Sequence, residues 1–448
     1  MTTKPDMLRD EIKPTLVKMT VPMMMGIVSL MLFNLADLYF VGKLGIEPLA
    51  ALGFTFPVCF SITSLAIGLG IGTSATLARL IGSGRHQEAS SLSTDNLLMT
   101  GIVITFIAIG CQFLIGPLFR LMGASENLIP YINAYMSTWF WGSTFLVLNM
   151  VGNSCMRASG DTKTPAKIMA FSSVLNVLLD PLLIFGWGPV PALGVQGAAV
   201  ASVMAWGITC CIGFHILFHR RGLLVVQPIQ PARMWRHWRE VMKIGLPAAL
   251  SNMMTPVANG VLTALVAAYG AEAVAAFGVG SRLESLSLLA CLALSMTLPP
   301  FVSQNFGAGQ VQRVNKSYKY AMQFALCWQL LIYILLVLMA DRIAGIFSDN
   351  AAVQDWIGIW ILIVPVGFGF QAATFLTASS FNALHQPFRA MRISITRLFV
   401  FYVPLGWLGA HFFDLKGMFA GLVLANALTA LVAWLWMRRH LRRLQAGA

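Results

Sequence analysis

Three acidic residues, Asp37, Asp180 and Glu284, lie well within long apolar stretches of the sequence. A charged side chain is costly in an apolar environment, so each carboxylate is a candidate for a functional role. Asp180 follows Asn176 by four residues, which places the two side chains on one face of a helix. A desolvated carboxylate can exchange a proton near neutral pH, whereas a cluster of carboxylates and amides can bind a sodium ion through oxygen atoms. Hydrogen bonding to neighbouring helices is the structural alternative for Asp37 and Asp180.

Other polar residues in apolar stretches predict either a substrate cavity or bracing between helices. Arg282 and Glu284 are two residues apart, so they cannot face each other on a helix, but each can pair with polar groups elsewhere. Asn149 and Asn153 are four apart and share a helix face, where they can line a cavity or hydrogen-bond to another helix. The candidate cavity residues are Asn34, Asn149, Met150, Asn153, Arg282 and Glu284.

The sequence lacks the usual motifs of catalysis, nucleotide binding and metal binding. It contains no Gly-x-Ser-x-Gly, no His-Glu-x-x-His and no Gly-x-x-x-x-Gly-Lys-Ser/Thr motif. No Cys-x-x-Cys pair occurs, and the pair His215 and His219 has no acidic residue beside it. We therefore predict that the protein is not an enzyme, uses no cofactor and holds no metal site.

Composition indicates that the elements carrying these residues cross a membrane. Hydrophobic residues make up 57% of the 448 residues and charged residues only 10%, against roughly 25% charged in ordinary soluble proteins. The net charge of +13 comes from basic residues in short gaps between apolar runs, which argues against a nucleic-acid partner. A helix needs about 20 apolar residues to cross the hydrocarbon core. The charge-free run 181–219 is long enough for the end of one span and the whole of the next, with a turn at 186–191 between them, so the sixth predicted span follows this turn. The other eleven predicted spans cover 15–41, 48–78, 96–119, 127–156, 165–185, 244–271, 285–306, 320–340, 356–388, 387–410 and 417–437.

The basic residues of the loops predict the orientation of these twelve spans. The N-terminal tail, the even-numbered loops and the C-terminal tail carry 25 Lys and Arg, and the opposite side carries four, with Arg282 left inside a span. The positive-inside rule therefore places both termini in the cytoplasm. The first apolar run is too long for a cleavable signal peptide, so we expect it to remain as the first span.

The second half of the chain repeats the first half. A shift of 225 positions pairs Lys18 with Lys243, Pro22 with Pro247, Gly45 with Gly270 and Glu47 with Glu272. We predict an all-α protein of two six-helix lobes, residues 1–224 and 225–448, which have the same orientation in the membrane and enclose a central cleft. This architecture is typical of alternating-access transporters. Pro22 interrupts the backbone hydrogen bonding of the first span. It therefore predicts either a hinge or a fixed bend where the helix enters the membrane near the cytoplasmic face.

Several motifs of the chain resemble the multidrug and toxic compound extrusion (MATE) family. The resemblance covers nearly the whole chain. It rests on Pro22 and Asp37 in span one, Asn176-x-x-x-Asp180-Pro181 in span five, Gly194-x-x-Gly197-Ala198-Ala199-x-Ala201-Ser202 in span six, and Gly82-Ser83-Gly84 with its repeat Gly307-Ala308-Gly309.

The resemblance implies a site for a coupling cation in the N-terminal half. In the DinF-like branch of the family, residues matching Asp37, Asn176 and Asp180, with a hydroxyl residue at the place of Ser202, form this site. The residue matching Pro22 is implicated there in bending of span one. The sequence has Ser at 202 where Thr is frequent. It also lacks an acidic residue in spans seven and ten, where the NorM-like branch has a second carboxylate cluster.

The resemblance implies a monomeric multidrug antiporter of a bacterial inner membrane that exports cationic or amphipathic compounds in exchange for protons. Protonation of Asp37 would break its hydrogen bonds with the side of span five that carries Asn176 and Asp180. Sodium coupling is one alternative. A lipid-linked precursor flippase is another, although such a protein would need more basic residues along its cleft, and Arg282 is the only basic residue expected deep in a span.

Overall fold

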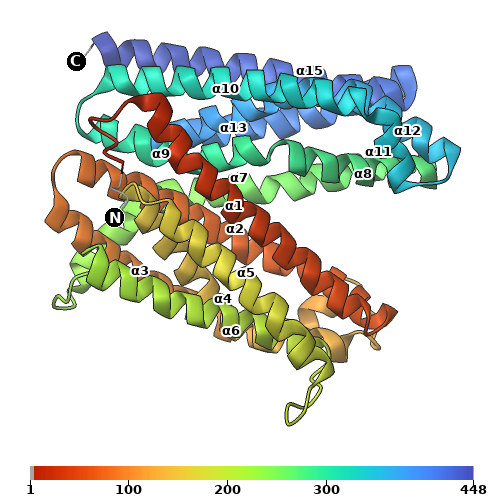
Figure 1. Ribbon diagram of the computed structural model, residues 1–448, viewed down its shortest axis with the longest axis horizontal. Coiled ribbons are helices and arrows are strands. Elements are labelled where there is room, and N and C mark those ends of the chain that lie inside the picture. Colours follow the sequence, from red (N-terminus) through yellow and green to blue (C-terminus); the bar gives the residue numbers. More distant parts are fainter. Residues whose placement is uncertain (1–4, 447–448) are drawn as a thin grey trace. The chain divides into compact units, whose positions relative to one another are not determined.

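The computed structural model describes residues 5–446, and these residues are almost entirely helical (Figure 1). Within them, β-structure is limited to one antiparallel bridge between Trp187 and Val190, which closes the turn expected at 186–191. The helices of the first half are α1 (Ile12–Gly42), α2 (Ile46–Gly82), α3 (His86–Leu121), α4 (Ile129–Ala158), α5 (Lys163–Phe185) and α6 (Val195–His215), which continues as the π-helix η1 (Ile216–Arg220).

The second half has more interruptions than the first half. Its elements are α7 (Pro231–Ala267), α8 (Ala271–Ser287), α9 (Leu289–Gly307), α10 (Val311–Leu338), α11 (Ala340–Phe347), α12 (Ala351–Ile363), the 3₁₀ turn η2 (Val364–Gly367), α13 (Phe368–Ala383), α14 (Pro387–Ile395), the π-helix η3 (Thr396–Tyr402) and α15 (Val403–Ala446).

Twelve membrane spans account for these helices. Within the described residues, nine helical segments are long and apolar enough to cross a membrane, and α8 with α9, bent by 44°, makes a tenth. Helix α4 is not among these ten, but its 30 residues are enough to cross. The 60-residue segment Pro387–Ala446 contains a break at Phe413 and Asp414, where the backbone leaves the helical conformation, so it supplies two spans.

The predicted eighth span began too late in the sequence. The absence of charge predicts a span over 285–306, but α8 begins at Ala271 and meets α9 at a bend beside Leu288. The reason is that Arg282 and Glu284 interrupt the charge-free run, although both lie inside the helix. A span that carries ionisable residues cannot be delimited by the absence of charge.

The described chain forms two compact units, each with its own apolar core. The first unit comprises Val21–Ala249 and has its core between α2, α3, α4 and α6. The second comprises Asp6–Thr20 together with the chain from Leu250 onward, and large side chains such as Trp360 and Phe301 fill its core. This division crosses α1 and α7. The lobe boundary between residues 224 and 225 stays a prediction.

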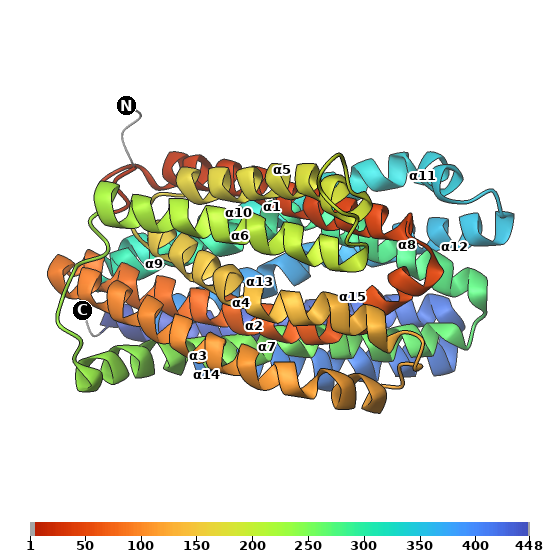
Figure 2. The same cartoon turned by 90° about the horizontal axis from the view of Figure 1, so that it is seen from below.

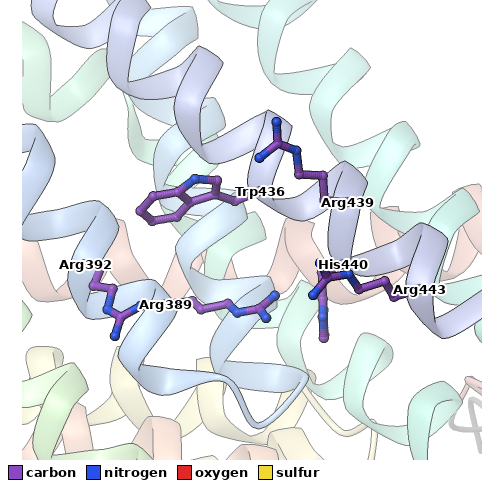
Figure 3. A pocket seen from close by; sticks show the side chains of 6 residues that line it. All are labelled: Arg389, Arg392, Trp436, Arg439, His440 and Arg443. Atoms are coloured by element: carbon purple, nitrogen blue, oxygen red, sulfur yellow. The ribbon is translucent and has the colours of Figure 1, made fainter.

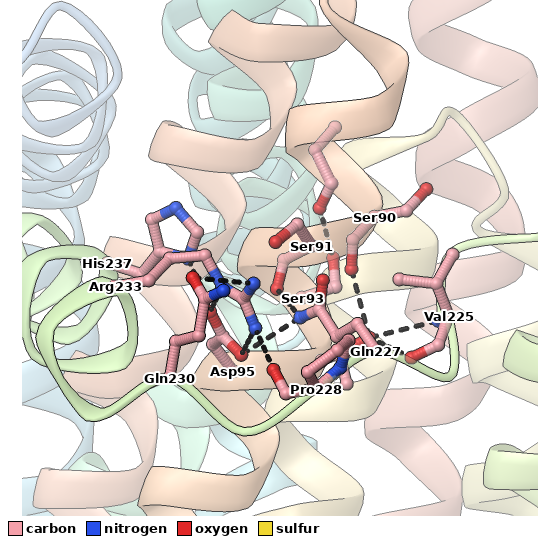
Figure 4. A network of polar contacts seen from close by, with 12 residues as sticks. Ser90, Ser91, Ser93, Asp95, Val225, Gln227, Pro228, Gln230, Arg233 and His237 are labelled. Carbon is pink, nitrogen blue, oxygen red and sulfur yellow. Dashed lines mark hydrogen bonds and ion pairs between the residues drawn. The ribbon is translucent and has the colours of Figure 1, made fainter.

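A buried carboxylate ties the connection between α6 and α7 to helix α3 in the first unit. Asp95 of α3 is 2% exposed and accepts a hydrogen bond from Arg233 Nε at 2.9 Å. Gln227 Nε2 and His237 Nδ1 each lie 2.9 Å from the same carboxylate (Figure 4). The network thus joins α3, the connecting segment and the first turns of α7.

We expect Asp95→Ala to lower the free energy of unfolding by about 3 kcal/mol, because Arg233 and His237 would lose their shared buried acceptor. Thermal unfolding of the detergent-solubilised protein measures the change. Glu88→Gln is the matched control, because it removes an exposed pair with Arg85 and is expected to cost less than about 1 kcal/mol. Equal losses in the two variants would contradict a structural role for Asp95.

Candidate functional site

Helices α5 and α6 bring together three of the four residues expected to bind the coupling cation. Asn176 Nδ2 donates to Asp180 Oδ1 at 3.2 Å and lies 3.3 Å from Ser202 Oγ on α6. The side chains of Asn176 and Asp180 are fully buried, and Ser202 is 2% exposed. The four-residue spacing on α5 therefore does place both polar groups on one face, and that face contacts α6.

A glycine allows this close approach of the two helices, which lie side by side in both views (Figure 1, Figure 2). A Cβ atom added at Gly197 would lie 2.4 Å from the carbonyl oxygen of Leu183, nearer than any side chain can come. Backbone hydrogen bonds from Leu193 and Gly194 to the end of α5 fix the same contact. Any larger residue at 197 would push α6, and with it Ser202, away from Asn176.

Asp37 on α1 lies close enough to this cluster for its charge to act on the other carboxylate. Its charge interacts with Asp180 of α5, with Tyr135 of α4 and with Cys59 of α2. Among the described residues no hydrogen bond joins Asp37 to Asn176 or Asp180, so the expected hydrogen bonding between them is wrong for this conformation. The two carboxylates meet as like charges.

The cluster has more buried acceptors than donors. Asp37 Oδ1, Asp180 Oδ2 and Asn176 Oδ1 are all buried, and within the described structure each lacks a hydrogen-bond partner. A buried acceptor without a donor costs free energy, and native proteins have few of them. A proton or a small cation bound in this cluster would give such oxygens the partner that they lack.

The asparagines of α4 join two helices of the first unit. Asn149 Nδ2 donates to Thr209 Oγ1 of α6 at 2.8 Å, and Asn153 Nδ2 donates to Asn149 Oδ1 at 3.1 Å. Met150 is half-buried, and its carbonyl accepts from the Ser154 hydroxyl. This geometry agrees with the inter-helix alternative, and it leaves the role of these residues in a substrate cavity a prediction.

The structure does not join Asn34 or Arg282 to either polar cluster. Asn34 is exposed and donates to the carbonyl of Leu30 in its own helix. Arg282 is exposed on α8. Their assignment to the substrate cavity stays a prediction.

Glu284 belongs to a buried polar chain in the second unit that the sequence did not reveal. Gln371 Nε2 donates to Glu284 Oε1 at 2.7 Å, and Asn426 Nδ2 lies 3.5 Å from Gln371 Oε1. At the other end, Arg397 Nε donates to Asn426 Oδ1 at 3.2 Å. Arg397 is also close enough to Glu284 for their opposite charges to interact.

Arg397 corrects the expectation that Arg282 is the only basic residue deep in a span. Its side chain is 5% exposed, and its guanidinium lies 4.9 Å from the centre of the Phe375 ring and 5.3 Å from that of Tyr402. It stands in η3, which carries the span starting at α14 onward into α15. The sequence predicts a cytoplasmic loop position for Arg397, because Arg389 and Arg392 precede it closely.

The two units thus treat their buried carboxylates differently. Glu284 accepts a hydrogen bond from Gln371, and the basic residue Arg397 is near enough for their opposite charges to attract within the second unit. The electrostatic partners of Asp37 and Asp180 among the described residues include no Lys or Arg. Binding of a proton or a cation therefore changes the local electrostatics more at Asp37 and Asp180 than at Glu284, which already has a basic residue nearby.

Comparisons with known proteins bear on the family of the chain. A family model described as MatE matches residues 22–182 and 247–408, two segments that begin 225 residues apart. The chain is 40% identical over 424 residues to a FAD transporter of Shewanella oneidensis, covering 95% of this chain and 94% of that protein. It is 25% identical over 434 residues to the probable multidrug resistance protein NorM of Thermotoga maritima, covering 94% and 92%.

A solved structure supports the same conclusion. The crystal structure of the Vibrio cholerae MATE transporter VcmN in the bent form matches with a TM-score of 0.92 and 34% sequence identity, covering 97% of this chain and 98% of that chain. The family model also covers well over half of this sequence. The chain is therefore a member of the MATE family of multi-pass membrane transporters, with twelve transmembrane helices.

Proposed function

We propose that the protein is a proton-coupled antiporter in which Asp37, Asp180, Asn176 and Ser202 form the cation site. The observation that carries this proposal is the pair formed by half-buried Asp37 and buried Asp180, whose electrostatic partners among the described residues include no base and whose buried oxygen atoms lack hydrogen-bond partners. The family supplies transport of organic compounds, and the cluster supplies a group whose charge can change during the cycle. No covalent step is needed.

A proton suits the cluster better than a sodium ion for an electrostatic reason. Two carboxylates that interact strongly share their titration, so one proton is held by the pair and removes the repulsion between them. In our scheme, a proton from the outer side neutralises the pair, α1 bends and the bound compound is released outward. Return of the proton to the cytoplasm restores the charge and the inward-facing state.

We place the protein in a bacterial inner membrane with both termini in the cytoplasm. The bias of 25 to 4 basic residues supports this orientation, and removing Arg397 from the cytoplasmic count leaves 25 − 1 = 24. The inner membrane is also where a proton gradient drives inward proton movement. We expect the transporter to act as a monomer.

Two classes of compound are candidates for the substrate. Cationic and amphipathic drugs suit an acidic site, because a cationic compound and a proton can compete for the same negative charge. The second candidate is FAD, favoured by the 40% identity to a relative that is named a FAD transporter, against 23% to 30% to relatives that are named multidrug proteins. The two compounds carry opposite charges, so one assay distinguishes them.

Transport by the purified protein in liposomes tests both parts of the proposal. We expect a pH gradient alone to drive movement of a fluorescent cationic dye or of FAD, and a sodium gradient at constant pH to drive neither. Vesicles without protein are the control for leakage. Transport driven by sodium alone would overturn proton coupling, and transport of FAD without the dye would assign the second substrate class.

A further inference from the structure

Two helices of the second unit line an open pocket of about 190 Å³ that carries several basic residues (Figure 3). Helix α14 contributes two arginines three residues apart, and α15 contributes basic residues on one face of its last turns. The lining residues are Arg389, Arg392, Trp436, Arg439, His440 and Arg443. Four arginines and a histidine thus face one small cavity.

No acidic side chain lines this pocket. From Phe368 to Ala446 the sequence has a single acidic residue, Asp414. Asp414 lies 26 residues before His440, which is about 39 Å along a helix. Within the described chain, none of the four lining arginines forms an ion pair.

His440 shows how closely the cations are crowded. Burial lowers its pKa, and the charges of Arg389 and Arg443 lower it further. Both guanidinium groups lie beside the histidine ring in Figure 3. Its Nε2 atom is buried and, in the described structure, has no hydrogen-bond partner, while the ring packs 5.9 Å from that of Phe381. Two guanidinium groups and a buried ring nitrogen without a hydrogen-bond partner thus lie together at this end of the described second unit.

We propose that this pocket binds the phosphate group of an anion, either the headgroup of an anionic phospholipid or a soluble phosphate compound. The planar guanidinium group of arginine can donate two parallel hydrogen bonds to two oxygen atoms of a phosphate, and its positive charge strengthens them. Basic pockets between transmembrane helices on the cytoplasmic side bind anionic headgroups in other membrane proteins. Trp436 lines the pocket beside the arginines, and tryptophan is enriched where a helix leaves the hydrocarbon core for the headgroup region.

The experiment compares Arg389→Gln/Arg443→Gln with Arg438→Gln/Arg442→Gln. Both double variants remove two positive charges from the same end of the molecule, but Arg438 and Arg442 are exposed and do not line the pocket. Binding of short-chain phosphatidylglycerol, short-chain phosphatidylcholine and inorganic phosphate to the purified full chain is measured by native mass spectrometry and by competition. We expect the pocket variant to lose at least about tenfold in affinity for phosphatidylglycerol, and the control to stay close to wild type.

The arms of the experiment distinguish the two sources of phosphate. Displacement of phosphatidylglycerol by inorganic phosphate would assign a soluble phosphate compound, whereas binding of the lipid alone would assign the headgroup. Equal losses in the two double variants, or equal binding of phosphatidylglycerol and phosphatidylcholine, would overturn the proposal. If the pocket variant does not fold, Arg392→Gln against Arg438→Gln makes the same comparison with one charge.

Discussion

Asp37→Asn is expected to abolish proton-driven export while the protein still folds and inserts. The amide keeps the shape of the side chain but cannot take up or release a proton. It also removes one of two like charges, since Asp37 and Asp180 interact within the first unit. The measurement is dye export by proteoliposomes under an imposed pH gradient, where we expect the variant to match vesicles that contain no protein.

Two further variants show whether the loss is specific to this carboxylate. Asp180→Asn is expected to impair export less if Asp180 only tunes its neighbour, because coupled carboxylates share their titration. Asp355→Asn removes an exposed carboxylate of α12 and is expected to leave export unchanged. Wild-type export by well-folded Asp37→Asn protein would remove Asp37 from the coupling role.

Local patterns in the sequence predicted the helices and part of the site correctly. Long runs without charge become helices because an apolar segment that crosses a bilayer must satisfy its own backbone hydrogen bonds. The spacing of Asn176 and Asp180 predicted one face of one helix, and the hydrogen bond between them confirms it. Gly197 was part of a recognised motif, and the structure gives its physical reason, the close approach of α6 to the Leu183 carbonyl.

Pairing between distant spans could not be predicted from those local patterns. Glu284 and Arg397 lie 113 residues apart in the sequence and interact through the fold of the second unit. Arg397 was read as a loop residue because the positive-inside rule counts charges without knowing where a helix continues. Similarly, no local pattern placed Asp95 in the network that fixes the connection to α7, because its partners follow more than 130 residues later.

Helix α1 passes from one compact unit to the other next to Pro22. The division falls between Thr20 and Val21. Before it, Thr20 Oγ1 lies 2.9 Å from Thr297 Oγ1 of the second unit. After it, Gly26 packs so closely on α5 that an added Cβ would lie 3.2 Å from Ala166 Cα. The proline therefore stands between two points at which the helix is held by different units.

Pro22→Ala is expected to reduce export severalfold while binding of the substrate survives. Proline cannot donate the hydrogen bond to the carbonyl four residues back, which is that of Lys18, so the wild-type helix bends there at low cost. Alanine restores the donor and stiffens the helix. Dye export measures the coupled movement, and fluorescence polarisation of the bound dye measures binding separately.

Pro247→Ala is the matched control that separates a coupled hinge from a merely shaped helix. The second division between the units, between Ala249 and Leu250, lies shortly after Pro247, so this proline also stands next to a passage between units, although it precedes its division whereas Pro22 follows its own. However, the position in α7 that matches Asp37 is Leu262, which cannot change its charge. If bending is driven by protonation, only the bend at Pro22 is coupled to a titrating group, and Pro247→Ala is expected to be milder. Equal losses of export in both variants, or no loss in either, would show that the two prolines only set the path of their helices.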